Sequence, residues 1–180
     1  MGEINLNNYE FTDDVSYSES YFIAKIQFKK IIKNFNSRKF KKTFDELFFY
    51  EKNYKSFLKK NNKILCGVIG YLLDDCYFTD IFFWNILYQK TNILEYRYFC
   101  ESNFHILYKK GIRRVIVPID KSRFKYEFYK KYSQKALFTK KEHKLLDEKL
   151  ISLYENYYLL EMNIEEYFEK SQEVERIKTF

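Results

Sequence analysis

The stretch from Lys109 to Ser133 constrains the fold of this chain most, and it reads KKGIRRVIVPIDKSRFKYEFYKKYS. Gly111 follows a helical pattern and predicts a left-handed cap where that helix ends. The β-branched run Val115–Val117 predicts a buried strand, which the only proline of the chain, Pro118, is expected to close. A second amphipathic segment over 124–132 follows at once. A helix, a strand and another helix in so few residues are typical of an α/β crossover unit.

Length and composition suit a single domain over residues 1–180. With 180 residues and 46% hydrophobic content, the chain can bury one sizeable core. Its three cysteines, Cys66, Cys76 and Cys100, lie in apolar segments and predict buried free thiols in a cytoplasmic protein. The two histidines show no ligand spacing with these cysteines, so we expect no metal site. No apolar run is long enough to span a bilayer, and the acidic N-terminus lacks a signal pattern.

The formal net charge of +7 is unevenly distributed. Between Lys25 and Lys60, twelve Lys and Arg residues stand against three acids, Asp45, Glu46 and Glu51. One interpretation is a solvated helical face. The other is a surface for an anionic partner, which is nucleic acid, an acidic protein or a cofactor phosphate. Nucleic acid is the least favoured of these, because the sequence has no helix-turn-helix, zinc-finger or RNA-binding aromatic pattern.

The first third of the chain predicts an edge strand or loop followed by helices. Residues 1–15 have no clear period, whereas Ser16–Asn36 has the apolar spacing of a helix. Thr43–Glu46 matches a capping box, which predicts the start of a second helix. That helix either continues to Lys60 or gives way to a strand over Tyr54–Leu58, and the pattern leaves both alternatives open.

Two long apolar runs then predict a β-hairpin. Lys63–Leu73 is nearly continuous and β-branched, which is typical of a central strand. A turn at Asn61–Asn62 is expected before this strand, and a tight turn at Asp74–Asp75 after it. Cys76–Asn85 then predicts a second, aromatic-rich strand. Asp80 interrupts this second strand, and a charge at that place must face a cleft or a partner.

A long helix is predicted over Ile93–Lys110, after a largely polar turn. Apolar residues recur in it at steps of three and four, so we expect them to pack and Glu95 and Glu101 to face solvent. Four further elements are expected: a strand at Ala136–Phe138, a helix at Glu142–Tyr154, a strand at Tyr157–Ile164 and a helical extension at Glu165–Lys178.

In this order, the elements from about Lys63 to Ile164 resemble the GNAT superfamily of N-acetyltransferases. The hairpin KILCGVIGYLLDDCYFTDIFFWN resembles the third and fourth strands of that family, and YYLLEMNI resembles its last strand. The resemblance implies a divergent member with an α/β (α+β) GNAT-like acyl-CoA N-acyltransferase fold, in which helices flank a mixed central sheet.

The turn before the long helix resembles the family's cofactor pattern, Gln/Arg-x-x-Gly-x-Gly/Ala. In the family its backbone N–H groups bind the pyrophosphate of coenzyme A, because free amide donors and the positive end of a helix dipole make an anion site. Here Gln89 fits, while Asn92 and Leu94 stand at the glycine and small-residue positions, and Asn tolerates a left-handed backbone. The resemblance implies that acetyl-CoA or another acyl-CoA binds at Phe83, Trp84, Gln89, Lys90, Thr91, Asn92, Ile93 and Ser122.

The crossover unit resembles the family's fifth strand and following helix, where Asn-x-x-Ala precedes a tyrosine. Ser122 stands at the asparagine position and Tyr129 at that of the tyrosine. The resemblance implies direct acyl transfer, in which an amine attacks the thioester carbonyl. Tyr129 would protonate the departing thiolate, and Asp80 would take the proton of the amine.

Each of these residues also has a simpler interpretation, and two functions therefore compete. Tyr129 is one of 18 tyrosines that can pack in a core, and Asp80 can be a rim carboxylate in a salt bridge. The first hypothesis is an acyltransferase that acts on an amine-bearing small molecule or protein. The alternative is a non-catalytic module of the same fold, whose basic segment Lys25–Lys60 binds nucleic acid or an acidic protein.

Overall fold

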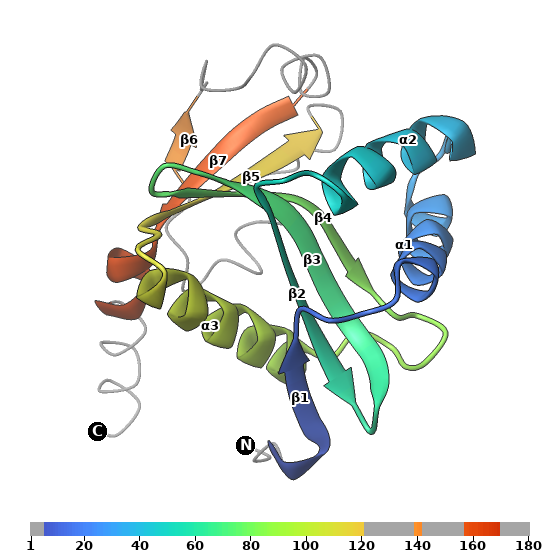
Figure 1. Cartoon of the computed structure of the whole chain (residues 1–180), viewed down its shortest axis with the longest axis horizontal. Helices are drawn as coiled ribbons and strands as arrows, with labels where there is room; N and C mark the ends of the chain where they lie inside the picture. The colour runs from blue at the N-terminus through green and yellow to red at the C-terminus, as the bar shows by residue number, and fades with distance from the viewer. Residues whose placement is uncertain (1–5, 121–138, 142–156, 170–180) are drawn as a thin grey trace. The chain divides into compact units, whose positions relative to one another are not determined.

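The computed structural model describes residues 6–120, 139–141 and 157–169 (Figure 1). Over these residues seven strands form one mixed sheet in the order β1-β2-β3-β4-β5-β7-β6, which confirms the predicted α/β class. The chain divides into two compact units, the first unit (Met1–Leu72 and Thr79–Ile106) and the second unit (Leu73–Phe78 and Leu107–Phe180). The elements are η1 (Leu6–Asn8), β1 (Tyr9–Thr12), α1 (Tyr17–Ile31), α2 (Ser37–Phe48), β2 (Asn53–Lys60), β3 (Lys63–Leu73), β4 (Cys76–Trp84), α3 (Ile93–Lys109), β5 (Arg114–Asp120), β6 (Thr139–Lys141) and β7 (Tyr157–Asn163).

The first unit contains an antiparallel meander of β1, β2 and β3. β1 pairs with β2 at the edge of the sheet, which confirms an edge strand within residues 1–15. β2 pairs with β3, so the open alternative at Tyr54–Leu58 is resolved as a strand. Asn61 and Asn62, with φ of 51° and 63°, make the predicted turn between them, because asparagine tolerates the positive φ of a two-residue hairpin. Gly67 of β3 lets the Phe57 ring approach closely, since a Cβ there would lie 2.4 Å from that ring.

The helices α1 and α2 pack through aromatic rings. α1 begins after Ser16, whose Oγ accepts a hydrogen bond from the N–H of Glu19. α2 begins after Asn36, whose Oδ1 accepts the N–H of Lys39 at 3.0 Å. The prediction that Thr43–Glu46 caps the second helix is therefore wrong, because Asn36 caps it earlier and Thr43 lies in its interior. Rings of α1 contact those of α2, as in the Phe28–Phe40 pair, whose ring centroids lie 5.0 Å apart.

α3 ends as predicted, but it buries a different face. Gly111 follows it with φ of 86°, which confirms the left-handed cap. Glu95 is 3% exposed, so the prediction that it faces solvent is wrong. It shares a stripe at steps of four with three other buried residues, which are Phe99, Asn103 and Leu107. Of the apolar residues expected to pack, Leu107 is buried, whereas Tyr96, Cys100 and Phe104 are half-buried.

In the second unit β5 pairs with β7 through Asp120 and runs parallel to the first residues of β4. The parallel ladder joins Cys76–Phe78 to Arg114–Ile116 and stops there. The prediction that Pro118 closes the strand is wrong, because the pairing of β5 with β7 continues past it to Asp120. A proline lacks one backbone N–H, so it removes a single hydrogen bond on one side of the strand and leaves the other pairings possible. Arg114 ties this unit together, since Nη2 lies 2.8 Å from Oδ1 of Asp75.

Several predicted elements lie outside the described residues. These include the helix at 124–132, the strand at 136–138, the helix at 142–154 and the site residues Ser122 and Tyr129. The strand predicted at Tyr157–Ile164 is confirmed as β7, and residues 164–169 are helical, as expected for the start of the terminal helix. None of the described helices is long and apolar enough to cross a membrane. In the same residues no group of three metal-ligating side chains comes together.

Candidate functional site

Asn85 anchors the turn that joins β4 to α3 in the first unit. Its Nδ2 donates to the carbonyl of Ile64 at 2.7 Å, and its backbone N–H donates to Leu65 at 2.7 Å. Its own carbonyl accepts the N–H groups of Tyr88 and Gln89, at 3.0 and 3.2 Å. The 9%-exposed Asn85 thereby fastens the turn to the buried strand β3, so the start of α3 is held in a defined position.

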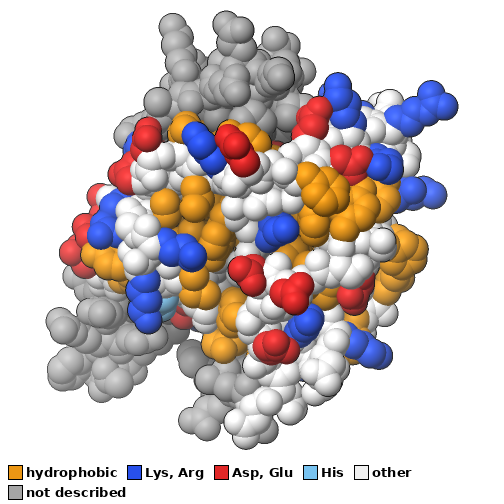
Figure 2. All heavy atoms as spheres, viewed as in Figure 1, with side chains coloured by type: hydrophobic (Ala, Val, Ile, Leu, Met, Phe, Trp, Pro, Cys, Tyr) orange, Lys and Arg blue, Asp and Glu red, His pale blue; other side chains and the backbone are white. Residues whose placement is uncertain are grey.

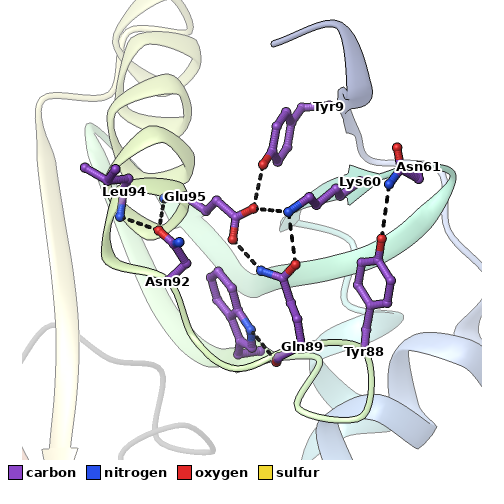
Figure 3. Close-up of polar contacts among 9 residues, drawn as sticks. Tyr9, Lys60, Asn61, Tyr88, Gln89, Asn92, Leu94 and Glu95 are labelled. Atoms are coloured by element: carbon purple, nitrogen blue, oxygen red, sulfur yellow. Dashed lines mark hydrogen bonds and ion pairs between the residues drawn. The ribbon is translucent and has the colours of Figure 1, made fainter. Parts of the chain in front are cut away.

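Asn92 caps the N-terminus of α3 (Figure 3). Its Oδ1 accepts the N–H groups of Leu94 at 2.9 Å and Glu95 at 3.3 Å. Among the described residues, positive φ occurs at Asn61, Asn62, Asp74 and Gly111, and Asn92 is not one of them. The sequence position of Asn92 suggested a substitute for a glycine with left-handed backbone, and its φ shows that it does not have this conformation. It acts as an N-cap, for which asparagine is among the preferred residues.

The turn presents backbone donors that no other described residue uses. The N–H groups from Lys90 to Ile93 make no hydrogen bond to another residue in the described ranges. Lys90 and Thr91 are exposed, and both precede the positive end of the α3 dipole. Free N–H donors, a cation and a helix N-terminus together suit an oxyanion such as a phosphate group.

A buried charge network lies against this turn. Oε1 of Glu95 accepts hydrogen bonds from Nζ of Lys60 at 2.6 Å and from the hydroxyl of Tyr9 at 2.5 Å. Gln89 bridges the same pair, because its Nε2 donates to Oε2 of Glu95 and its Oε1 accepts from Lys60 at 3.0 Å. Figure 3 shows these side chains converging from β1, β2, the turn and α3. The side chain of Gln89 is thus committed to holding the turn.

The network keeps Glu95 and Lys60 charged. Burial alone would raise the pKa of Glu95, but the hydrogen bonds from Lys60 and Tyr9 lower it below its ordinary value. The hydrogen bond to Glu95 raises the pKa of Lys60. The pKa of Tyr9 is also raised, mainly by burial and to a smaller extent by its hydrogen bond to Glu95. A carboxylate next to an anion site would repel the anion, and the ammonium of Lys60 balances this charge.

Sequence reasoning missed this network for two reasons. The stripe of Glu95 with Phe99, Asn103 and Leu107 is visible in the sequence, but two polar residues in it obscured it. Tyr9 and Lys60 lie far from Glu95 in the chain, and only the β1–β2–β3 meander brings them together.

The other predicted site residues have different surroundings. Asp80 is half-buried on β4. Phe83 and Trp84 are 0% and 1% exposed, so both residues lie in the core of the first unit. The N–H of Trp84 donates to Gln27, and its Nε1 donates to the carbonyl of Gln89 at 3.2 Å. The structure therefore brings Trp84 together with the turn Gln89–Ile93.

The basic segment Lys25–Lys60 is only partly free. Lys41 and Lys42 pair with Asp45 and Glu46, and the half-buried Lys60 pairs with Glu95. Figure 2 shows basic side chains beside exposed hydrophobic ones on the face where α1 and α2 lie. In and next to α1 and α2, five exposed basic residues have no salt bridge to a described residue, and they are Lys29, Lys30, Lys33, Arg38 and Lys39. The exposed large hydrophobic residues of the same part of the chain are Phe22, Ile31 and Phe49.

No protein-family model matches the sequence, and no curated protein matches it either. Solved structures do match the fold. An acetyltransferase of the GNAT family from Staphylococcus aureus Mu50 has a TM-score of 0.60 at 12% identity, covering 87% of this chain and 99% of that one. The PaiA N-acetyltransferase from Thermoplasma acidophilum, in complex with coenzyme A, has a TM-score of 0.56 at 9% identity, covering 86% and 98%.

The ribosomal-protein-S18-alanine N-acetyltransferase from Escherichia coli also has a TM-score of 0.56, at 14% identity, covering 86% of this chain and 92% of that one. At such identities the similarity establishes the fold. The chain has the fold of the GNAT acetyltransferases, as the element order predicted.

Proposed function

We propose that this protein is an acyltransferase that moves an acetyl or longer acyl group from acyl-CoA to an amine. The observation that carries the proposal is the turn from Gln89 to Ile93. Its N–H groups from Lys90 to Ile93, which no described residue accepts, and the exposed Lys90 lie at the N-terminus of α3. There the sequence resembles the coenzyme A pattern of the GNAT fold. One structure with the same fold was solved in complex with coenzyme A, which supports the assignment.

The residues of the turn fit a diphosphate. The N–H groups from Lys90 to Ile93 donate to no described residue, and Lys90 adds a positive charge. The negative charge of Glu95 is balanced by Lys60 at 2.6 Å, so it does not oppose an anion. The N–H groups of Leu94 and Glu95 donate to the side chain of Asn92. A glycine at position 92 has no side chain and would leave both donors open.

The remaining roles follow from the resemblance. Acyl-CoA, when bound, supplies a thioester carbonyl that an amine can attack. Asp80 on β4 accepts the proton of the amine, directly or through a water molecule. Tyr129 holds the proton that a departing sulfur requires, and Ser122 contacts the cofactor. The acceptor is a small molecule or a protein that carries an amine.

Calorimetric titration with CoA and acetyl-CoA tests the proposal. We expect saturable binding to the wild type and weaker binding to Lys90→Glu, because the substitution puts a carboxylate beside the diphosphate. Lys52→Glu is the matched control, because this substitution makes the same change of charge at an exposed residue outside the turn. No binding at millimolar CoA, or equal losses in both variants, would contradict the proposal.

A non-catalytic module of the same fold is the second candidate. The use of two α3 donors by Asn92 favours it, as do the exposed basic and aromatic side chains on α1 and α2. Such a module binds an acidic protein or nucleic acid through charge, so its affinity must fall steeply with salt. Salt-sensitive binding to such a partner, together with no binding of CoA, would favour this candidate over the acyltransferase.

A further inference from the structure

Two of the N–H groups at the start of α3 already have an acceptor from within the chain. Oδ1 of Asn92 lies 2.9 Å from the N–H nitrogen of Leu94 and 3.3 Å from that of Glu95. These are the second and third residues of the helix, whose N–H groups point outward along its axis. A phosphate oxygen that binds at a helix N-terminus uses the same donors.

We infer, resting on the proposed function, that Asn92 is an affinity-determining residue that competes with the diphosphate of acyl-CoA. In the free protein its side chain occupies the Leu94 and Glu95 donors. A diphosphate reaches them only when that side chain turns away. Asn92 therefore lowers the affinity of this chain for acyl-CoA compared with a chain that has no side-chain acceptor at this position.

The surroundings of Asn92 permit this exchange. The residue is exposed, so its side chain can turn toward solvent by rotation about χ1, without a change of the backbone. The helix start does not depend on the cap alone, because Glu95 is also held by Lys60, Tyr9 and Gln89. A charged phosphate oxygen accepts a stronger hydrogen bond than a neutral amide oxygen, so the ligand can displace it.

The chain offers a matched control in α2. Asn36 caps that helix with the same chemistry, since its Oδ1 accepts the N–H of Lys39 at 3.0 Å. Replacing either asparagine with alanine removes one cap and lowers stability by a similar amount. Only Asn92 lies in the proposed cofactor turn, so only its replacement should change the affinity for CoA.

Calorimetric titration of CoA into the wild type, Asn92→Ala, Asn92→Asp and Asn36→Ala tests the inference. We expect Asn92→Ala to bind CoA about two- to thirtyfold more tightly than the wild type, which corresponds to the usual stabilisation by a cap. Asn92→Asp keeps the acceptor and adds a negative charge, so it should bind more weakly than the wild type. Asn36→Ala should bind like the wild type.

Amide NMR gives a second measurement. On addition of CoA to the wild type, the N–H resonances of Leu94 and Glu95 should shift, because their acceptor changes from Asn92 to phosphate. An Asn92→Ala variant that folds but binds CoA no more tightly than the wild type would overturn the inference and leave the proposed function standing. If neither protein binds millimolar CoA, both are overturned. If both bind and Asn92→Ala binds more tightly, both are supported.

Discussion

Two clusters in the first unit have the same chemistry and different surroundings. In one, Glu95 accepts hydrogen bonds from Tyr9 and Lys60. In the other, Asp45 accepts hydrogen bonds from Tyr17 and Lys41. In both clusters the pKa of the carboxyl group is lowered and those of the tyrosine and the lysine are raised.

Burial separates the two clusters. The side chains of Glu95 and Lys60 are 4% and 26% exposed, whereas those of Asp45 and Lys41 are 33% and 56% exposed. In water an ion pair contributes little, because solvent screens it and side-chain entropy opposes it. In a buried site the loss of one partner leaves a charge without compensation. The same three groups are therefore expected to stabilise the fold strongly next to α3 and weakly on α2.

The largest effect is expected for Lys60→Met. The substitution leaves the buried carboxylate of Glu95 without its cation, and we expect a loss of about 3 kcal/mol in the free energy of unfolding. Urea denaturation measures this loss, with Lys41→Met as the matched control, for which we expect little change. Equal losses in the two variants would show that burial does not distinguish the clusters.

A smaller effect is expected from pH. The folded pKa of Glu95 lies below its ordinary value of 4.5, so its ionised form stabilises the fold above that pH. This contribution is lost as the pH falls through the folded pKa. Thermal unfolding followed from neutral to acidic pH should therefore show a shallower acid loss for Glu95→Gln than for the wild type. Asp45→Asn should change the acid loss less, and a larger change there would reverse the comparison.

The smallest effect is expected from salt. Ions screen exposed charges over about 8 Å at physiological strength, and buried pairs are screened much less. Added sodium chloride should reduce the small contribution of the Lys41–Asp45 pair, whereas that of the Lys60–Glu95 pair should persist. Double-mutant cycles at low and high salt measure both coupling energies. A buried pair that weakens as much as the exposed one would contradict the assigned burial.

Much of the fold was predictable from local patterns. The hairpin of β3 and β4, the turn at Asn61–Asn62 and the helix ending at Gly111 each follow from residues close together in the sequence. At Pro118 a local pattern competed with a distant contact, because the strand continues where β7 pairs with it. At Thr43–Glu46 the capping-box pattern competed with another local signal, the earlier cap at Asn36.

The candidate site was predictable only in its backbone. The resemblance at Gln89–Leu94 located a turn before a helix, because such a turn depends on neighbouring residues. The side-chain roles were not predictable in this way. Gln89 proved to be a bridge to Lys60 and Glu95, and Asn92 a helix cap.

By itself, the sequence determined most of the element order, since hydrophobic period and turn residues act over short distances. The GNAT fold was predicted from the resemblance of that order to the superfamily. Only the tertiary structure decided which charges are buried. Tyr9, Lys60 and Glu95 meet because two strand pairings and the anchored turn bring them together. Whether a carboxylate faces water or a cation depends on such contacts, and a pattern of neighbouring residues does not contain them.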